Sequence, residues 1–99
     1  LTPGGVWTNS SSRARKENIQ DLSTEEALAT LSQLEPVHFN YLNDRSEDYV
    51  GFIAEDVPDL VATRDRDGLS AMDIVAVLTK VVQEQQKKID ALEAKLEQR

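Results

Sequence analysis

Cysteine is absent from this chain of 99 residues, and several kinds of chemistry are excluded with it. A chain without cysteine has no disulfide framework, no thiol nucleophile and no cysteine-based metal site. The one histidine, His38, has no second histidine with which to share a metal ion. We therefore expect neither a metal nor a cofactor, and we expect His38 to lie on the surface or to be partly packed.

Positive charge is also scarce, because 11 Lys and Arg residues stand against 18 Asp and Glu residues, for a net charge of −7. Phosphate binding needs a basic face, so we expect no nucleic-acid partner. No apolar run approaches the roughly 20 residues that span a bilayer, so we expect no membrane partner. The chain begins at Leu1 without a signal-peptide pattern, and we expect it to be a piece of a longer protein.

The basic residues that are present gather in one place, since Arg13, Arg15 and Lys16 follow directly on a run of serines. A serine and a neutral lysine can perform acyl chemistry: the amine takes the hydroxyl proton, and the alkoxide attacks a carbonyl. The lysine must first lose its proton, which desolvation or neighbouring cations favour. Ser11 and Lys16 are five positions apart, so a turn, rather than a helix or strand, must bring them together. A flexible solvated linker explains the same residues, and both interpretations stay open here.

The middle of the chain predicts a small α+β unit. Ser23 and Glu26 form a capping box, and a helix of about three turns follows and ends before Pro36. Its apolar stripe is formed by Leu28, Leu31 and Leu34. Residues 37–42 alternate as a half-buried strand does, 43–48 read as a polar turn, and 49–54 read as the paired second strand. A short helical turn over 55–60 and a turn over 65–68, joining two very short strands, complete the unit.

From about residue 70 to the end, no Pro or Gly interrupts the chain, and the apolar residues step by three and four. Position a of the heptad holds Val75, Val82, Ile89 and Leu96, and position d holds Leu78, Gln85 and Leu92. This regularity predicts a coiled coil. The helix would run about 45 Å, too long for the small preceding domain, so its far half must contact copies of itself.

The heptads favour a parallel arrangement but leave the number of chains open. Lys88 at g can reach Glu93 at e of a parallel neighbour, whereas β-branched residues at a with leucine at d favour two strands. Against two strands, Ile74 and Val81 at g broaden the apolar face beyond a dimer seam. The pattern by itself therefore predicts a parallel oligomer of unspecified size.

Four blocks of sequence in fixed order resemble a known family: SSRARKENI, EALATLSQLEPVHFNY, GFIAEDVPDLV and LTKVVQEQQKKIDALEAKL. Together, over about residues 8–99, they are similar to the C-terminal intramolecular chaperone auto-processing domain, the peptidase S74 family, of phage tailspikes, tail fibres and endosialidases. The resemblance implies a homotrimer. It also implies a division into residues 1–10 as the end of an upstream stalk with the cleavage junction, 11–69 as the auto-processing domain, and 70–99 as the coiled-coil helix.

The same resemblance implies the site. The family's motif places a lysine five positions after its serine, and counting back from Lys16 selects Ser11, rather than Ser10 or Ser12, as the nucleophile. Lys16 is then the general base, and the bond broken is Ser10–Ser11. Gly51 resembles the family's retained glycine, and we expect its missing side chain to let backbone approach the junction.

The implied function is a trimerisation chaperone. Three chains would bring the upstream β-stalks of the same polypeptides into register, cut themselves off, and leave a phage-type tail protein. We expect the precursor to be a virion tail component or to lie in the host cytoplasm during assembly. The alternative is a permanent homotrimerisation module that never cuts.

Overall fold

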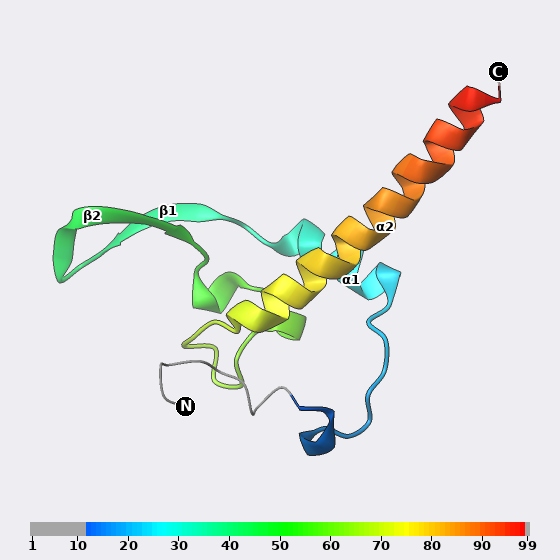
Figure 1. The fold of residues 1–99 in the computed structure, drawn as a ribbon. Helices are drawn as coiled ribbons and strands as arrows, with labels where there is room; N and C mark the ends of the chain where they lie inside the picture. The colour runs from blue at the N-terminus through cyan, green and yellow to red at the C-terminus, as the bar shows by residue number, and fades with distance from the viewer. Residues whose placement is uncertain (1–11, 99) are drawn as a thin grey trace.

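The computed structural model describes residues 12–98, which form a small α+β domain followed by a long helix (Figure 1). In chain order the elements are η2 (Arg13–Arg15), α1 (Thr24–Gln33), β1 (Val37–Tyr41), β2 (Asp44–Gly51), η3 (Ala54–Asp56), η4 (Asp59–Val61) and α2 (Ala71–Glu97). β1 and β2 form a two-stranded antiparallel sheet that projects from the helical body. None of the helices within residues 12–98 has both the length and the apolar character to cross a bilayer.

Helix α1 begins where the capping box predicted. The Ser23 hydroxyl accepts a hydrogen bond from the Glu26 N–H at 3.1 Å, and the helix ends at Gln33, before Pro36. The predicted stripe was wrong at Leu28, which is 40% exposed, because the buried face centres on Ala27 and Thr30. The small side chain of Ala27 lets α1 approach α2 closely, and Leu28 is turned to the flank of that contact.

The hairpin differs from its prediction. β2 starts at Asp44 instead of residue 49 and ends at Gly51, so the turn is residues 42–43 alone and residues 52–54 are not strand. Phe39 pairs with Tyr49 and Tyr41 with Asp44, and the register shifts between the two pairs. The extra residues of β2 bulge out of the ladder. Residues 44–50 of β2 are all exposed, so polar side chains are tolerated in this strand. The sequence therefore has no alternation of apolar residues there that would indicate a strand.

The segment after the hairpin holds two single turns of 3-10 helix instead of one helical turn, with the proline of the predicted turn, Pro58, as N-cap of the second. Val57 and Val61 from this segment are buried. The following turn closes with the Arg66 N–H donating to the Thr63 carbonyl at 3.1 Å. An isolated bridge between Ala62 and Leu69 flanks it, which confirms the prediction of a turn between very short strands.

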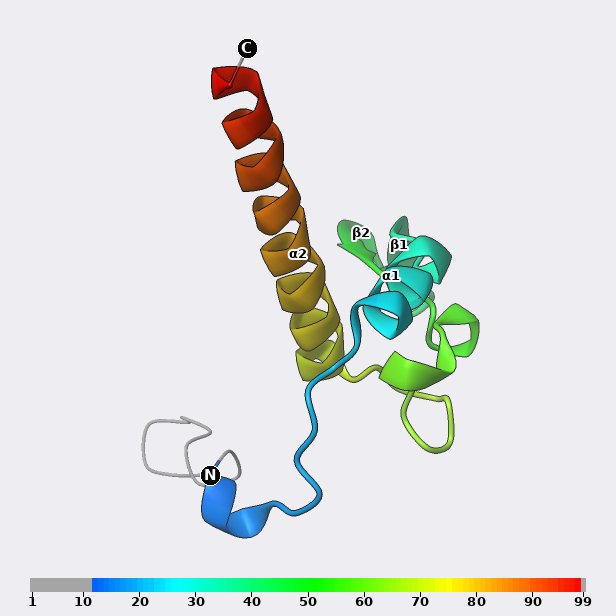
Figure 2. The same ribbon diagram turned by 90° about the vertical axis from the view of Figure 1, so that its right-hand side faces the viewer.

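The core joins α1, the 57–61 segment and the first half of α2, and its buried hydrophobic members are Ala27, Val57, Val61, Ile74, Val77 and Val81. Helix α2 confirms the predicted long helix, but Ile74 and Val81 do not broaden an intermolecular seam as expected. They face their own domain, because α1 packs on that side of the helix. Beyond Val81 no α2 residue is buried, and the C-terminal half projects alone (Figure 2).

Candidate functional site

The described part of the junction segment contains one turn of 3-10 helix, η2. The Ser12 hydroxyl accepts from the Ala14 N–H at 3.3 Å, which caps η2. The Arg15 N–H donates to the Ser12 carbonyl, and the Lys16 N–H to the Arg13 carbonyl, each at 3.1 Å. Ser11 and the Ser10–Ser11 bond lie outside the described residues, as does the whole of residues 1–10.

Lys16 lies in a solvent-exposed part of the described chain. No residue of η2 is buried, and the connection from residue 16 to residue 21 is exposed throughout. Asn18 in this connection has a positive φ of 54°. Figure 2 shows η2 at the end of this extended connection, apart from α1 and α2. The single chain therefore does not enclose Lys16 within residues 12–98.

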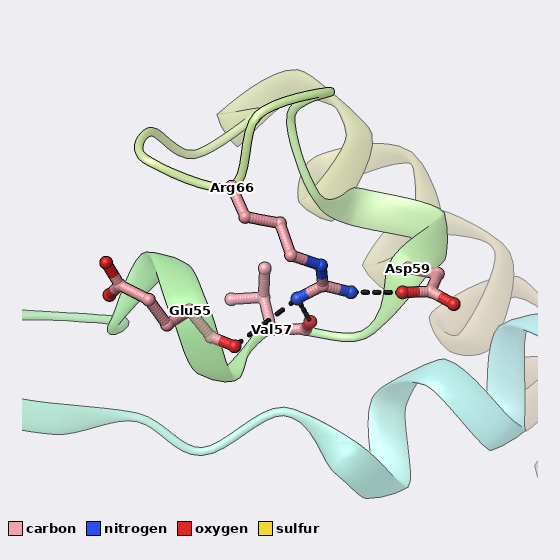
Figure 3. A network of polar contacts seen from close by, with 4 residues as sticks. All are labelled: Glu55, Val57, Asp59 and Arg66. Atoms are coloured by element: carbon pink, nitrogen blue, oxygen red, sulfur yellow. Dashed lines mark hydrogen bonds and ion pairs between the residues drawn. The ribbon is translucent and has the colours of Figure 1, made fainter.

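A network around Arg66 was missed by sequence reasoning. One guanidinium nitrogen, Nη1, donates to the carbonyls of Glu55 at 3.3 Å and Val57 at 2.8 Å, and the other, Nη2, pairs with the Asp59 carboxylate (Figure 3). Arg66 has a positive φ of 58°, which turns its side chain back over the η3–η4 corner. Two of its partners are backbone carbonyls far along the chain, so no local pattern pointed to the contact. The network fixes the turn that leads into α2.

Gly51 leaves space for a neighbouring side chain within the hairpin. A Cβ at this position would lie 3.1 Å from Cε1 of Phe39, so the missing side chain makes room for an aromatic ring. That ring belongs to a cluster in which Phe39 stacks on Tyr49 at 5.8 Å between centroids, and Tyr41 meets both rings edge-on at 5.3 Å. Gly51 thus supports the aromatic face of the hairpin.

The heptad positions of α2 form a continuous exposed row. Their exposed fractions run from 41% at Leu78 to 64% at Leu96, and the apolar members are Val75, Leu78, Val82, Ile89, Leu92 and Leu96. Near the start of the row a shallow apolar groove is lined by Val75, Leu78, Thr79, Val82 and Gln83. The row turns away from α1, because the buried residues of α2 occupy the adjoining face. A partner helix of matching pattern is the surface that such a row fits.

In the described part of the chain, acidic residues give no sign of a metal centre. Within residues 12–98, no three side chains of the kinds that ligate metals are grouped closely enough to hold an ion. His38 is exposed on β1, opposite Val50. Among residues 12–98, the candidate functional regions are therefore the junction segment and the exposed a/d row of α2.

In comparisons with known proteins, one family model matches this chain. A family model of peptidase S74, described as a chaperone of endosialidase, matches residues 11–66, more than half of the chain. The match runs from the predicted nucleophile through the hairpin to Arg66, and α2 lies beyond it. Searches of curated proteins and of solved structures gave no match.

Proposed function

Because the chain belongs to the peptidase S74 family, the chaperones of endosialidase, we propose that it is a self-cleaving trimerisation chaperone for an upstream stalk of the same polypeptide. The observation that carries this proposal is the exposed a/d row of α2, which has no partner among residues 12–98. The family supplies the chaperone role, and the row supplies the means of bringing chains together.

Two measures of size support a partner for the row. The accessible surface is 8415 Å², where a folded monomer of 11.1 kDa exposes about 5,700 Å². The radius of gyration is 18.0 Å, where about 13 Å is usual for 100 residues. The large hydrophobic side chains in this exposed surface, among them those of the a/d row, would gain free energy by being buried against copies of the chain.

The proposed oligomer is a parallel homotrimer. With Ile74 and Val81 taken up by the domain's own core, the free seam consists of the a and d positions alone. Such a seam suits two or three strands, and the choice of three rests on the family resemblance. Lys88 and Glu93, at g and e, favour the parallel direction, in which the three upstream stalks emerge from the same end.

The proposed reaction breaks the Ser10–Ser11 bond. Neutral Lys16 takes the proton of the Ser11 hydroxyl at Nζ, and the alkoxide adds to the Ser10 carbonyl carbon. When the tetrahedral intermediate collapses, the C–N bond breaks and the leaving amine of Ser11 receives the proton back from Nζ. An ester then joins the Ser10 carbonyl to the Ser11 oxygen. Water hydrolyses it to a carboxylate at Ser10 and a free domain that begins at Ser11.

Assembly is the proposed trigger of this step. Lys16 is exposed in the single chain, whereas a general-base lysine needs an environment that disfavours its charge. Arg13 and Arg15 supply neighbouring positive charge, and adjacent protomers would supply desolvation. Cleavage then follows trimer formation and makes the assembled stalk kinetically hard to unfold.

The proposed benefit to the stalk is one of effective concentration. Strands from three separate chains must meet before they can pair, which is slow because the contacts are non-local. A coiled coil beside them makes that encounter intramolecular. The protein would accordingly act on a phage tail-fibre or tailspike precursor, in the host cytoplasm or on the nascent virion tail.

Mass spectrometry combined with sedimentation tests the proposal. The wild-type chain, expressed with its upstream segment, should give a trimer and a fragment that begins at Ser11. The matched Ser11→Ala chain should give a trimer of uncut length, because the hydroxyl serves the chemistry only. Uncut wild-type chain in a stable trimer would support the permanent trimerisation module instead, and a monomeric wild-type protein would contradict both functions.

A further inference from the structure

A large apolar side chain on the first turn of α2 is unexplained by the seam. Met72 is 74% exposed, the most exposed of the large hydrophobic residues of that helix. It lies three residues before Val75, which places it at heptad position e rather than at a or d. Position e flanks the seam of a coiled coil, where charged residues are usual.

The domain also has a pocket at the base of the hairpin. It is lined by the aromatic face of the hairpin, by the segment that follows β2, and by the residues just before α2; its lining includes Phe39, Tyr41, Tyr49, Ile53, Glu55 and Leu69. Tyr41, Tyr49, Ile53 and Leu69 are all exposed. The pocket is therefore an apolar and aromatic hollow, with carboxylates at Glu55 and Asp67.

The heptad register places these two features near each other in neighbouring copies. Ile74 and Val81, at g, pack into the domain's core, so each domain sits on the g flank of its own helix. In a parallel coiled coil the g flank of one helix lies beside the e flank of the next. Each domain therefore faces the e flank of a neighbour, which is the flank that carries Met72.

The heights along the axis agree as well. Leu69, in the pocket, directly precedes the first turn of α2, and Met72 lies within that turn. Parallel helices in register hold equal residues at equal height. The pocket of one copy is consequently level with Met72 of the next.

We propose that Met72 of each protomer inserts into the hairpin pocket of its neighbour, so that the trimer is closed by three domain-to-helix contacts in addition to the seam. This inference rests on the parallel homotrimer of the proposed function. Methionine suits the position because its flexible thioether fits irregular apolar gaps and makes favourable contacts with aromatic rings. A two-stranded hairpin is marginally stable alone, and the insertion would order it in the assembled state.

Cysteine crosslinking tests the contact directly, because the natural chain contains no cysteine. In the uncut Ser11→Ala chain, Met72→Cys is combined with Glu55→Cys, whose exposed side chain lies at the pocket. A short bismaleimide should convert this protein into covalent dimers and trimers on a denaturing gel. The matched control replaces Met72→Cys by Asp73→Cys, one residue further on at position f, and should stay monomeric on the gel.

Sedimentation of the same samples separates two kinds of failure. A trimer in solution that gives no covalent oligomers, or equal yields from the Asp73→Cys control, overturns the Met72 contact and leaves the proposed function standing. A monomer in solution overturns the proposed function and the contact with it. Crosslinks from Glu55→Cys to an Arg13→Cys chain, in place of Met72→Cys, would assign the pocket to the basic junction and likewise overturn the inference.

An association measurement adds a readout that needs no crosslinker. Met72→Asp should weaken trimer association by about tenfold or more, equivalent to about 1.4 kcal/mol, while Met72→Leu should retain it. Equal association constants for the two variants would contradict burial of this side chain.

Discussion

Arg66 contributes through the shape of its head group as well as its charge. The planar guanidinium reaches two backbone carbonyls and one carboxylate from a single position (Figure 3). The Asp59 side chain is almost fully exposed, so the ion pair itself is worth little. The carbonyl contacts matter more, because they fix the corner that carries the buried Val57 against the turn.

We expect Arg66→Lys to lower the free energy of unfolding by about 1–2 kcal/mol, because an ammonium cannot reproduce the forked contact with the carbonyls. Urea unfolding followed by circular dichroism, at one fixed protein concentration, measures the change. Asp59→Asn is the matched control and should cost at most about 0.5 kcal/mol. If Asp59→Asn were the more damaging change, the ion pair would be the dominant contact.

Lys16→Arg tests the base at the junction while keeping the positive charge. A guanidinium stays protonated, so it cannot accept the Ser11 proton, and we expect the variant to remain uncut as a folded trimer. Mass spectrometry after complete assembly gives the answer. Normal processing of this variant would exclude Lys16 as the general base.

At the scale of elements, α2 has two apolar faces with different partners. Ile74, Val77 and Val81 pack against α1 and the loops, and the a/d row beside them is left for other chains. Ile74 and Val81, at position g, and Val77, at position c, all lie on one side of the a/d seam, so the two apolar faces of α2 adjoin. One helix thereby links the domain's own fold to the association of chains.

Paired substitutions should separate the two faces. Val77→Ala, at a position 1% exposed, should lower the free energy of unfolding by about 1.5–3 kcal/mol, through lost burial and a small cavity. Val82→Ala, at a position 61% exposed, should leave the fold of the domain intact and weaken association in sedimentation equilibrium. If instead Val77→Ala weakened association and Val82→Ala destabilised the domain, the contacts of α1 with α2 would be rearranged in the assembled protein.

A charge cluster on α2 has a consequence for the pH dependence of stability. Lys80 Nζ lies 3.2 Å and Lys87 Nζ 3.4 Å from Glu84 Oε1. The hydrogen bond from Lys80, with the charge of Lys87 behind it, holds the pKa of Glu84 below its ordinary value. A carboxyl whose pKa is lower in the folded state stabilises the fold above its unfolded pKa, and the contribution is lost as pH falls through the folded pKa.

We therefore expect Glu84→Gln to lower the Tm at neutral pH and to differ progressively less from wild type as the solution is acidified. Once Glu84 is protonated in both folded and unfolded wild-type chains, the difference should vanish. Thermal unfolding from pH 7 to pH 3, at constant protein concentration, measures it. Lys80→Gln should show the same convergence, and a gap between wild type and Glu84→Gln that widened on acidification would contradict the sign of the shift.

At the scale of the whole molecule, the described chain resembles one part of an assembly. The hairpin and the C-terminal half of α2 project in different directions from a small core (Figure 1). In the single chain, the aromatic face of the hairpin and the a/d row of α2 are both exposed to water. Fold, assembly and cleavage are then steps of one proposed sequence, in which the junction is completed last.

Ile89→Asp tests this coupling from a distance. The substitution places carboxylates in a seam layer, where removing each from water costs on the order of several kcal/mol. We expect the variant to remain uncut at concentrations where wild type is fully processed, and higher concentration to restore part of the cleavage. A demonstrably monomeric Ile89→Asp chain that cut at the wild-type rate would show that one chain holds a complete site.

Local patterns in the sequence sufficed wherever the deciding contacts are local. The capping of α1 by Ser23, the stop before Pro36, the turn near Asp65 and the length of α2 all depend on neighbours within a few residues or on a repeated period. The family followed from the order of the sequence blocks along the chain. The bounds of β2 did not, because its polar residues lie on an exposed, bulged strand and carry no alternation.

Tertiary structure decided which apolar residues the domain keeps for itself. The sequence gives Ile74, Val81 and Val82 equal apolar character, and only the position of α1 buries the first two and exposes the third. The tertiary structure also decided that Gly51 makes room for Phe39 and that Arg66 holds the η3–η4 corner. Gly51 and Phe39 lie on different strands, and the Arg66 side chain contacts the backbone of Val57, nine positions earlier in the chain. Burial and long-range hydrogen bonds depend on how elements pack, which no single stretch of sequence encodes.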